Sequence, residues 1–307
     1  MTSALRGLRV GFIERFHPPG YRGAVVDLLL PLLREAGARV DLVHAEQGLR
    51  RLDEPLPWDL AVLKSGSAVA LHLAAAAEGW GIPVVNRSDA TRLAQDKLAS
   101  AVILQRADLP IASAHLAWLG PDLTRKKVSA RWEADGDGRT ALTYGSGDQT
   151  RLLEQLETLA DRPMIVKAAR GSRGTGLWTV EPGELTALIP SLPEGPYLLM
   201  EWVPHTGDDL KVFAAGEWMA AIERPFPAKT LGDKRGRPAR VPKEVSEVVR
   251  EAGLRLGLTC FGCDFVSGPD GWRLVDVNAF PGYKGAEEAP SALAVEISRV
   301  AAEGVRA

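Results

Sequence analysis

Short apolar strands alternate with helices through the first 85 residues, and this alternation limits the folds open to the chain more than any other feature. The predicted strands are residues 8–13, 40–43, 60–63 and 83–85, and the predicted helices are residues 24–36 and 68–78. Strands that alternate with helices in this way form parallel sheets. The N-terminal part is therefore predicted to be an α/β domain with an open parallel sheet. No Gly-x-Gly-x-x-Gly follows the first strand, so the sequence lacks the dinucleotide fingerprint there.

The composition excludes several classes of protein. Among 307 residues, 37 basic side chains stand against 39 acidic ones, which leaves a formal net charge of −2. This balance gives no general excess of positive charge for nucleic acid or an acidic membrane, so any anion site must be local. Two cysteines cannot build a disulfide framework, and the most apolar run, residues 68–77, is too short to span a bilayer. We expect a cytoplasmic protein that binds neither nucleic acid nor membranes.

The rest of the chain is predicted to mix strands and helices. A helix capped by Ser88 or Asp89 continues to about residue 107, and a polar, turn-rich stretch surrounds residues 135–138. Further strands are expected at residues 111–119, 163–167, 177–180, 197–203, 210–214 and 218–222, and further helices at residues 149–159, 184–188, 243–256 and 291–302. We divide the chain into an N-terminal domain (1–88), a central domain (89–202) and a C-terminal domain (203–307).

A predicted hairpin at residues 260–278 carries the strongest chemical signal. With a turn near its middle, Asp264 lies across from Val275 or Asp276. Asp276 and Asn278 are two apart on one strand and therefore share a face. Like charges opposite each other are destabilising, so a cation is expected between the two carboxylates. Because hard oxygen ligands suit Mg²⁺ or Mn²⁺, we favour a metal site over the alternative, a solvated strand face.

A glycine-rich loop follows the strand that ends at Lys167. Gly171, Gly174 and Gly176 would let backbone N–H groups approach phosphate oxygens, which a lysine at the strand end can also reach. The loop is not a Walker A motif, because no Lys-Ser or Lys-Thr follows its last glycine. A phosphate loop and a flexible hairpin loop are both open readings. The pair Asp96-Lys97 reads as an ordinary solvated pair unless its context gives it a role.

Five motifs follow one another between residues 86 and 285. They are Lys97, the strand and loop of residues 166–176, the strands 198–203 and 209–213, and the run Asp-Val-Asn-Ala-Phe-Pro-Gly at 276–282. In this order they resemble the ATP-grasp superfamily, and in particular its RimK-like carboxylate–amine ligases. The resemblance implies an α/β ATP-grasp fold, with the nucleotide between the central and C-terminal parts and the acceptor facing the N-terminal part.

The resemblance implies ATP contacts for several residues. Lys97 and Lys167 would bind the phosphates, and the loop of Gly171, Ser172, Arg173, Gly174, Thr175 and Gly176 would close over them. Glu201, Trp202 and Val203 would meet the adenine edge, and Asp209 would hold the ribose.

The resemblance also implies a metal site and a catalytic pair. Asp264, Asp276 and Asn278 would bind one or two Mg²⁺ ions, or Mn²⁺. Arg224 would lie near the transferred phosphate, and Lys211 is the second residue expected to act in catalysis. Asp276 stands where the superfamily usually has glutamate, which shortens the reach of this ligand and allows less bidentate coordination of the metal.

The substrate half departs from the RimK-type pattern. Asp-Leu-Lys at 209–211 replaces Asp-Ile-Arg of the glutamate ligases, and their Arg-Ser-Asn element has no counterpart in residues 225–241. Residues 210–213 and 275–283 are at least as similar to inositol-phosphate kinases, which share the fold but phosphorylate an alcohol. The sequence therefore predicts an ADP-forming carboxylate–amine ligase that uses an acyl phosphate, with a small-molecule kinase or a non-catalytic ATP sensor as alternatives.

Lesser features leave further alternatives. Cys260 and Cys263 are expected to be small buried side chains rather than half of a zinc site. The basic loop of residues 229–240 is either solvated or a mobile clamp for an anionic substrate. Lys64 ends a strand where open sheets bind ligands, although a coincidental surface charge is the favoured reading. The substrate is expected to be a small molecule or a peptide, with an anionic substrate as one option. Homo-oligomer formation is left open.

Overall fold

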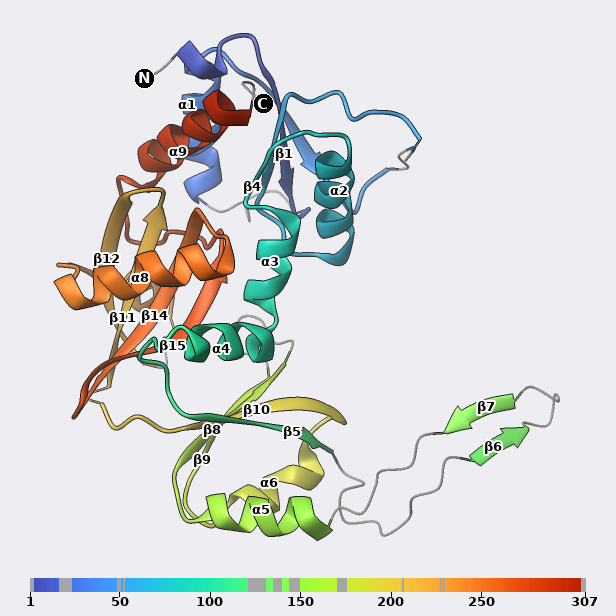
Figure 1. Cartoon of the computed structure of the whole chain (residues 1–307). Coiled ribbons are helices and arrows are strands. Elements are labelled where there is room, and N and C mark those ends of the chain that lie inside the picture. The colour runs from blue at the N-terminus through green and yellow to red at the C-terminus, as the bar shows by residue number, and fades with distance from the viewer. Residues whose placement is uncertain are drawn as a thin grey trace. The chain divides into compact units, whose positions relative to one another are not determined.

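The computed structural model describes residues 3–16, 24–48, 51, 53–120, 131–134, 140–143, 150–169, 176–205, 207–226, 228 and 230–304. The chain forms two compact units, one of residues 1–111 with 203–307 and one of residues 112–202. Figure 1 shows the helices and strands of both units. The division into three domains at residues 88 and 202 stays a prediction.

The first unit begins with the parallel sheet that the sequence predicts. After the short 3-10 helix η1 (Ser3–Leu5), strands β1 (Arg9–Glu14), β2 (Arg39–His44), β3 (Leu60–Leu63) and β4 (Val84–Val85) pair in the order β2-β1-β3-β4. Helices α1 (Ala24–Glu35) and α2 (Ala68–Gly79) cover opposite faces, because alternate residues of each strand point to opposite sides. The side chain of Ser67 accepts a hydrogen bond from the N–H of Ala70 and so begins α2.

A five-stranded antiparallel sheet forms the other half of this unit. Its order is β13-β12-β11-β14-β15, from β11 (Asp208–Ala215), β12 (Trp218–Pro225), β13 (Arg237–Ala239), β14 (Cys260–Gly268) and β15 (Gly271–Ala279). Helix α8 (Lys243–Leu256) packs on one face and ends at Gly257, which has a φ of 68°. Part of the other face, including Phe213, Ala215 and Ile222, packs on the N-terminal layer and on α9 (Ala289–Gly304). The predicted hairpin is therefore confirmed.

The single helix predicted from Ser88 or Asp89 to residue 107 is wrong. The structure has two helices, α3 (Ser88–Gln95) and α4 (Lys97–Arg106), and Arg87 rather than Ser88 or Asp89 precedes the first. Asp96 separates them with an extended backbone, and its side chain accepts hydrogen bonds from the N–H groups of Leu98 and Ala99. Aspartate is among the best residues for this capping position, so it ends one helix and begins the next.

The basic segment 229–240, predicted as a loop, is largely regular among its described residues. Helix α7 (Leu231–Arg235) begins with a reciprocal capping pair between Thr230 and Asp233, and β13 follows it. Arg237 of β13 forms ion pairs with Asp208 and Glu223. The segment is therefore fixed against the sheet edge by short-range hydrogen bonds and by charge.

The second unit is built on an antiparallel sheet of order β5-β10-β8-β9. Its strands are β5 (Ala114–Leu119), β8 (Met164–Ala168), β9 (Leu177–Val180) and β10 (Gly195–Glu201). Helices α5 (Thr150–Ala160) and α6 (Leu185–Leu188) and the 3-10 helix η3 (Ile189–Ser191) share an apolar core with this sheet. A separate hairpin of β6 (Arg131–Ala134) and β7 (Thr140–Thr143) occupies the stretch that the sequence marks only as polar. None of the helices in the described part of the chain is both long and apolar enough to cross a bilayer.

Candidate functional site

Six polar residues share one face of the five-stranded sheet. On β11, Leu210 and Val212 pack in the core beneath α8, so Asp209 and Lys211 point to the opposite face. The same alternation applies on β12 and β14, where Ala221 and Phe265 face α8. The polar face carries Asp209, Lys211, Arg224, Asp264, Asp276 and Asn278.

A β-bulge brings the two predicted metal ligands together. From the turn, the register pairs Gly268 with Gly271 and continues without interruption to the pairing of Phe265 with Leu274. The next pair is Asp264 with Asp276, so Val275 is the extra residue on β15. An unbroken register would place Asp264 across from Val275. The bulge therefore decides between the two pairings that the sequence leaves open.

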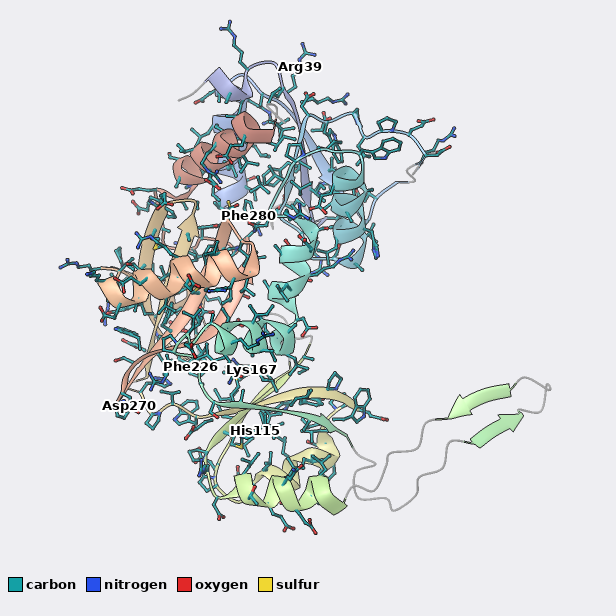
Figure 2. The ribbon with its side chains drawn as sticks, in the orientation of Figure 1. Arg39, His115, Lys167, Phe226, Asp270 and Phe280 are labelled. Atoms are coloured by element: carbon teal, nitrogen blue, oxygen red, sulfur yellow. The ribbon has the colours of Figure 1, made fainter. Side chains whose placement is uncertain are left out.

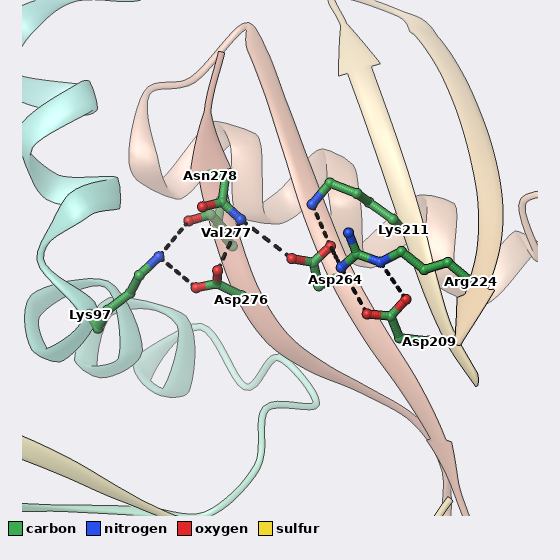
Figure 3. A network of polar contacts seen from close by, with 8 residues as sticks. All are labelled: Lys97, Asp209, Lys211, Arg224, Asp264, Asp276, Val277 and Asn278. Atoms are coloured by element: carbon green, nitrogen blue, oxygen red, sulfur yellow. Dashed lines mark hydrogen bonds and ion pairs between the residues drawn. The ribbon is translucent and has the colours of Figure 1, made fainter. Parts of the chain in front are cut away.

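Two lysines neutralise this pair of carboxylates (Figure 3). Lys97 Nζ lies 2.5 Å from Asp276 Oδ1, and it also donates to the carbonyl oxygen of Val277 at 3.1 Å. Lys211 Nζ lies 2.5 Å from Asp264 Oδ1. In this structure each carboxylate of the pair therefore has a lysine of its own as counter-charge. Asp96 and Lys97 are therefore more than the ordinary solvated pair, because Asp96 caps α4 and Lys97 pairs with Asp276.

Arg224 is held by two carboxylates on the same face. Its Nε and Nη2 donate to the two oxygens of Asp209 at 2.6 and 2.8 Å, and Nη2 also lies 3.3 Å from Asp264 Oδ1. Asp209 and Arg224 are register partners on β11 and β12, which explains the two-point geometry. Burial raises the pKa of Asp209, although its hydrogen bonds to Arg224 act in the opposite direction. The ribose role predicted for Asp209 remains a prediction, and its carboxylate is bound to Arg224 here.

The charges of the network balance. The three carboxylates of Asp209, Asp264 and Asp276 face the three cations of Lys97, Lys211 and Arg224. Buried charges are tolerated where they are paired and hydrogen-bonded, as they are here. An incoming polyanion together with a divalent cation can be accommodated by re-pairing, since the lysines can move from aspartates to phosphate oxygens. The network therefore has both kinds of ligand that a metal–phosphate complex needs.

The donor set around Asp264 fits a hard divalent cation. Asp264 and Asp276 present carboxylate oxygens, and Asn278 Nδ2 lies 2.9 Å from Asp276 Oδ2 and 3.4 Å from Asp264 Oδ2. Rotating the amide of Asn278 by half a turn would present its oxygen to the same space. Carboxylate and amide oxygens with retained waters are the ligands that Mg²⁺ prefers. Within the described residues no group of three or more His, Cys, Asp and Glu side chains could hold a metal, so this site depends on the amide.

Other predicted nucleotide residues lie in the second unit. Lys167 is on β8, labelled in Figure 2, where it pairs in register with Leu198 of β10 and Leu177 of β9. Glu201 ends β10 and is exposed, and Trp202 follows it. Val203 is the first residue of the chain that returns to the first unit. Of the predicted phosphate loop, Gly171 to Thr175 lie outside the described residues, and Gly176 has a φ of 79°.

The two cysteines are buried, as predicted. Cys260 and Cys263 are both free and fully covered by the first unit. Desolvation raises the pKa of each thiol well above its ordinary value. A thiol in this state is a poor nucleophile and a poor metal ligand, so neither residue joins the site.

The sequence analysis does not predict two features of the site. One is the role of Asp96, whose cap starts α4 at Lys97 and so aims that lysine at β15. The other is the bulge at Val275. Its signal is a break in the apolar alternation, since Leu274 and Val277 both face α8 although they are three residues apart.

Curated proteins resemble this chain in sequence. No family model matches the chain. A probable alpha-L-glutamate ligase of Citrobacter koseri is 26% identical, over 87% of this chain and 83% of the relative. A ribosomal protein bS6–L-glutamate ligase of Salmonella schwarzengrund is 25% identical over the same shares.

Solved structures resemble the whole chain. The RimK domain ATP-grasp protein of Sphaerobacter thermophilus has a TM-score of 0.67 at 17% identity and covers 96% of this chain and 98% of its own. The ATP-grasp ligase PsnB, solved with a minimal precursor, Mg and ADP, has a TM-score of 0.62 at 16% identity, with 97% and 98% covered.

The chain is an α/β protein with the ATP-grasp fold. Within that class, the resemblance to RimK-like ligases that the sequence motifs predict is confirmed by these relatives.

Proposed function

We propose that the chain is an ATP- and Mg²⁺-dependent carboxylate–amine ligase that releases ADP. The observation that carries the proposal is the convergence of three cations and three carboxylates on one face of an ATP-grasp sheet. The curated relatives named above are glutamate ligases, and the neighbour PsnB is a ligase solved with Mg and ADP. No kinase is among these proteins, so the kinase alternative is not favoured.

The proposed roles divide the site between nucleotide and reaction. Lys97, Lys167 and the loop of residues 171–176 bind the phosphates, and residues 201–203 meet the adenine. Asp264, Asp276 and Asn278 hold Mg²⁺, with Mn²⁺ as an alternative ion. When bound, the ion neutralises phosphate oxygens and orients them.

The reaction needs positioning and charge rather than a nucleophilic side chain. An oxygen of the substrate carboxylate forms a bond to the γ-phosphorus, and the bond from phosphorus to the bridging oxygen of ADP breaks. Arg224 and Lys211 hold the oxygens of the phosphoryl group as charge develops on them. An amine then attacks the acyl carbon of the acyl phosphate, phosphate leaves, and the nitrogen loses a proton.

The substrate class stays broad at this level. One relative is a ribosomal protein bS6–L-glutamate ligase, and PsnB has also been solved with a precursor peptide, so we propose a peptide or a small molecule with a carboxylate. We also propose a cytoplasmic location, and homo-oligomer formation is left as an alternative.

A trapping assay tests the proposal. The protein is incubated with MgATP, hydroxylamine and a panel of amino acids and small peptides, and both ADP and hydroxamate are measured. Hydroxamate that depends on ATP and on an added acid identifies carboxylate activation. ADP release that requires only a polyol or an inositol phosphate would replace the ligase with the kinase. Nucleotide binding without turnover of any acceptor would favour the sensor.

A further inference from the structure

Helix α7 carries two exposed cations that the proposed mechanism does not use. Lys234 and Arg235 end this helix, and the side chains of both are exposed. Within the described part of the chain neither side chain forms an ion pair or a hydrogen bond. Arg237, two residues further on, is instead paired with Asp208 and Glu223. The basic segment therefore has one cation that fixes it to the sheet edge and two that face solvent.

The last turn of α7 lies on the face of the five-stranded sheet that carries the reaction residues. On β12, Ile222 belongs to the core shared with the N-terminal layer, and Arg224, two residues further on, shares its face. A β-carbon built on Gly285 would lie 3.1 Å from the side chain of Ile222 and would collide with the carbonyl oxygen of Arg235. The end of α7 therefore packs over the strand that carries Arg224.

Gly236 shows how close the two cations come to Arg224. Its φ is 59°, and a β-carbon there would collide with the carbonyl oxygen of Glu223 and lie 3.3 Å from the β-carbon of Arg224. Since consecutive α-carbons are about 3.8 Å apart, the α-carbon of Arg235 lies within about 9 Å of that atom. An extended peptide advances about 3.3–3.6 Å per residue. A carboxylate two or three residues from one bound at Arg224 can therefore reach Arg235.

The exposed side of α7 combines charge with an apolar side chain. Residues three and four apart share one side of a helix, so Lys234 and Arg235 lie beside Leu231, which is 57% exposed. The acid of this helix, Asp233, accepts a hydrogen bond from the N–H of Thr230 at 2.8 Å and so serves the helix cap. Two cations next to an apolar side chain complement a peptide with acidic side chains better than they complement a small ion.

We propose that Lys234 and Arg235 bind acidic side chains of a peptide substrate whose reacting carboxylate lies at Arg224 and Lys211. This inference rests on the proposed ligase function and narrows its substrate class to peptides with several carboxylates close together. Contacts between exposed charges are individually weak and are screened by salt. The affinity should therefore depend on both cations and on ionic strength. In the rival role the two side chains are only solvated, and their removal would not change binding.

A binding measurement with matched peptides tests the proposal. The probes are fluorescein-labelled, amidated hexaglutamate and hexaglutamine, titrated with protein in Mg²⁺ and a non-hydrolysable ATP analogue while anisotropy is measured. K234Q/R235Q removes both charges, and K234R/R235K keeps them. K243Q/R250Q is the matched control, because it removes two cations of α8, whose side chains are 91% and 56% exposed and which covers the opposite face of the sheet.

The expected result is a loss of affinity for hexaglutamate that is confined to K234Q/R235Q. Its Kd should rise about three- to thirtyfold, as expected for two exposed charge contacts. More salt should weaken the binding of hexaglutamate to the wild type more than to this variant. K234R/R235K and K243Q/R250Q should bind as the wild type does, and hexaglutamine should not bind. The melting temperatures should agree, because all four side chains are exposed.

Several outcomes would overturn the proposal. They are no binding of hexaglutamate by the wild type, equal binding of the two peptides, an unchanged Kd in K234Q/R235Q, and an equal loss in K243Q/R250Q. Equally tight binding of an oligonucleotide with six phosphates, lost in K234Q/R235Q, would also overturn it. That result would mark a general polyanion surface rather than a site for acidic peptides.

Turnover separates this inference from the ligase proposal. Hydroxamate formation with MgATP and hydroxylamine is measured for hexaglutamate and for a peptide in which five of its glutamates are replaced by glutamine. K234Q/R235Q should raise the KM for hexaglutamate alone, with kcat within about threefold and the KM for ATP unchanged. Peptide binding that this variant weakens, without hydroxamate from either peptide, would support the α7 site while the ligase proposal fails. Hydroxamate with the same KM in both proteins would overturn the α7 site and leave the ligase in place.

Discussion

The two faces of the five-stranded sheet differ sharply although the same strands form both. The face beneath α8 is apolar, with side chains such as Val212, Phe265 and Val249 of the helix fully buried. The opposite face carries three carboxylates and three cations at one end, and further along β11 it carries Phe213, whose ring packs on that of Tyr283. Because side chains alternate along a strand, neighbours in sequence serve different purposes. Stability and chemistry can therefore be changed separately on one strand.

The largest expected effect is on the charged face. Asp264→Asn removes the carboxylate that Lys211 and Arg224 share. We expect ATP turnover to fall by at least about a hundredfold, which is the cost of losing one electrostatic contact at a reacting phosphate or oxyanion. Steady-state ADP release measures it, and Asp270→Asn at the exposed turn of the same hairpin is the control. A full rate in D264N would remove the metal and catalytic assignments.

The next residue tests the apolar face. Phe265 is fully buried in the core beneath α8, so Phe265→Ala should lower the free energy of unfolding by about 3–5 kcal/mol. Denaturant unfolding measures this loss. The kcat of the molecules that remain folded should match that of the wild type. A selective loss of kcat would mean that the two faces are not independent.

A smaller effect is expected at Asp209, whose carboxylate accepts two hydrogen bonds from Arg224. Asp209→Asn keeps one hydrogen bond to Arg224 and loses the two-point ion pair. We expect kcat to fall about ten- to hundredfold, as for other residues that orient a charged group, with the KM for ATP unchanged. A rise in that KM with normal kcat would instead support the ribose role predicted from the sequence.

The smallest effect concerns the helix cap that aims Lys97. Asp96→Ala should destabilise the protein by about 1 kcal/mol, because two N–H groups of α4 lose their acceptor. Thermal unfolding measures the change, and Asp96→Asn is the matched variant that should recover most of it. Equal stability of the alanine and wild-type proteins would show that the cap does not fix the start of α4.

The sequence predicts the order of elements well, since most of them depend on local patterns. The parallel strands, helix α8 and the hairpin of β14 and β15 follow from apolar periodicity and turn residues. The break at Asp96 is less visible, because an aspartate within a helical pattern reads equally well as a surface residue. The fold of residues 230–239 depends on a capping pair and on ion pairs with distant strands. Partners so far apart in sequence leave no local pattern.

The candidate site is predicted in its residue types but not in its pairing. Asp264, Asp276 and Asn278 stand out because oxygen-bearing side chains interrupt buried strands. Their partners could not be read in the same way, since Lys97 and Arg224 come from other elements.

Because of the bulge at Val275, the pairing of Asp264 with Asp276 depends on the number of residues between them as well as on their side chains. Deleting one residue between Asp264 and Asp276 would keep every functional side chain. It would still turn one of the two aspartates toward the apolar core beneath α8. Single-substitution scans would not detect this dependence on the number of residues. Insertions and deletions in the hairpin would expose it.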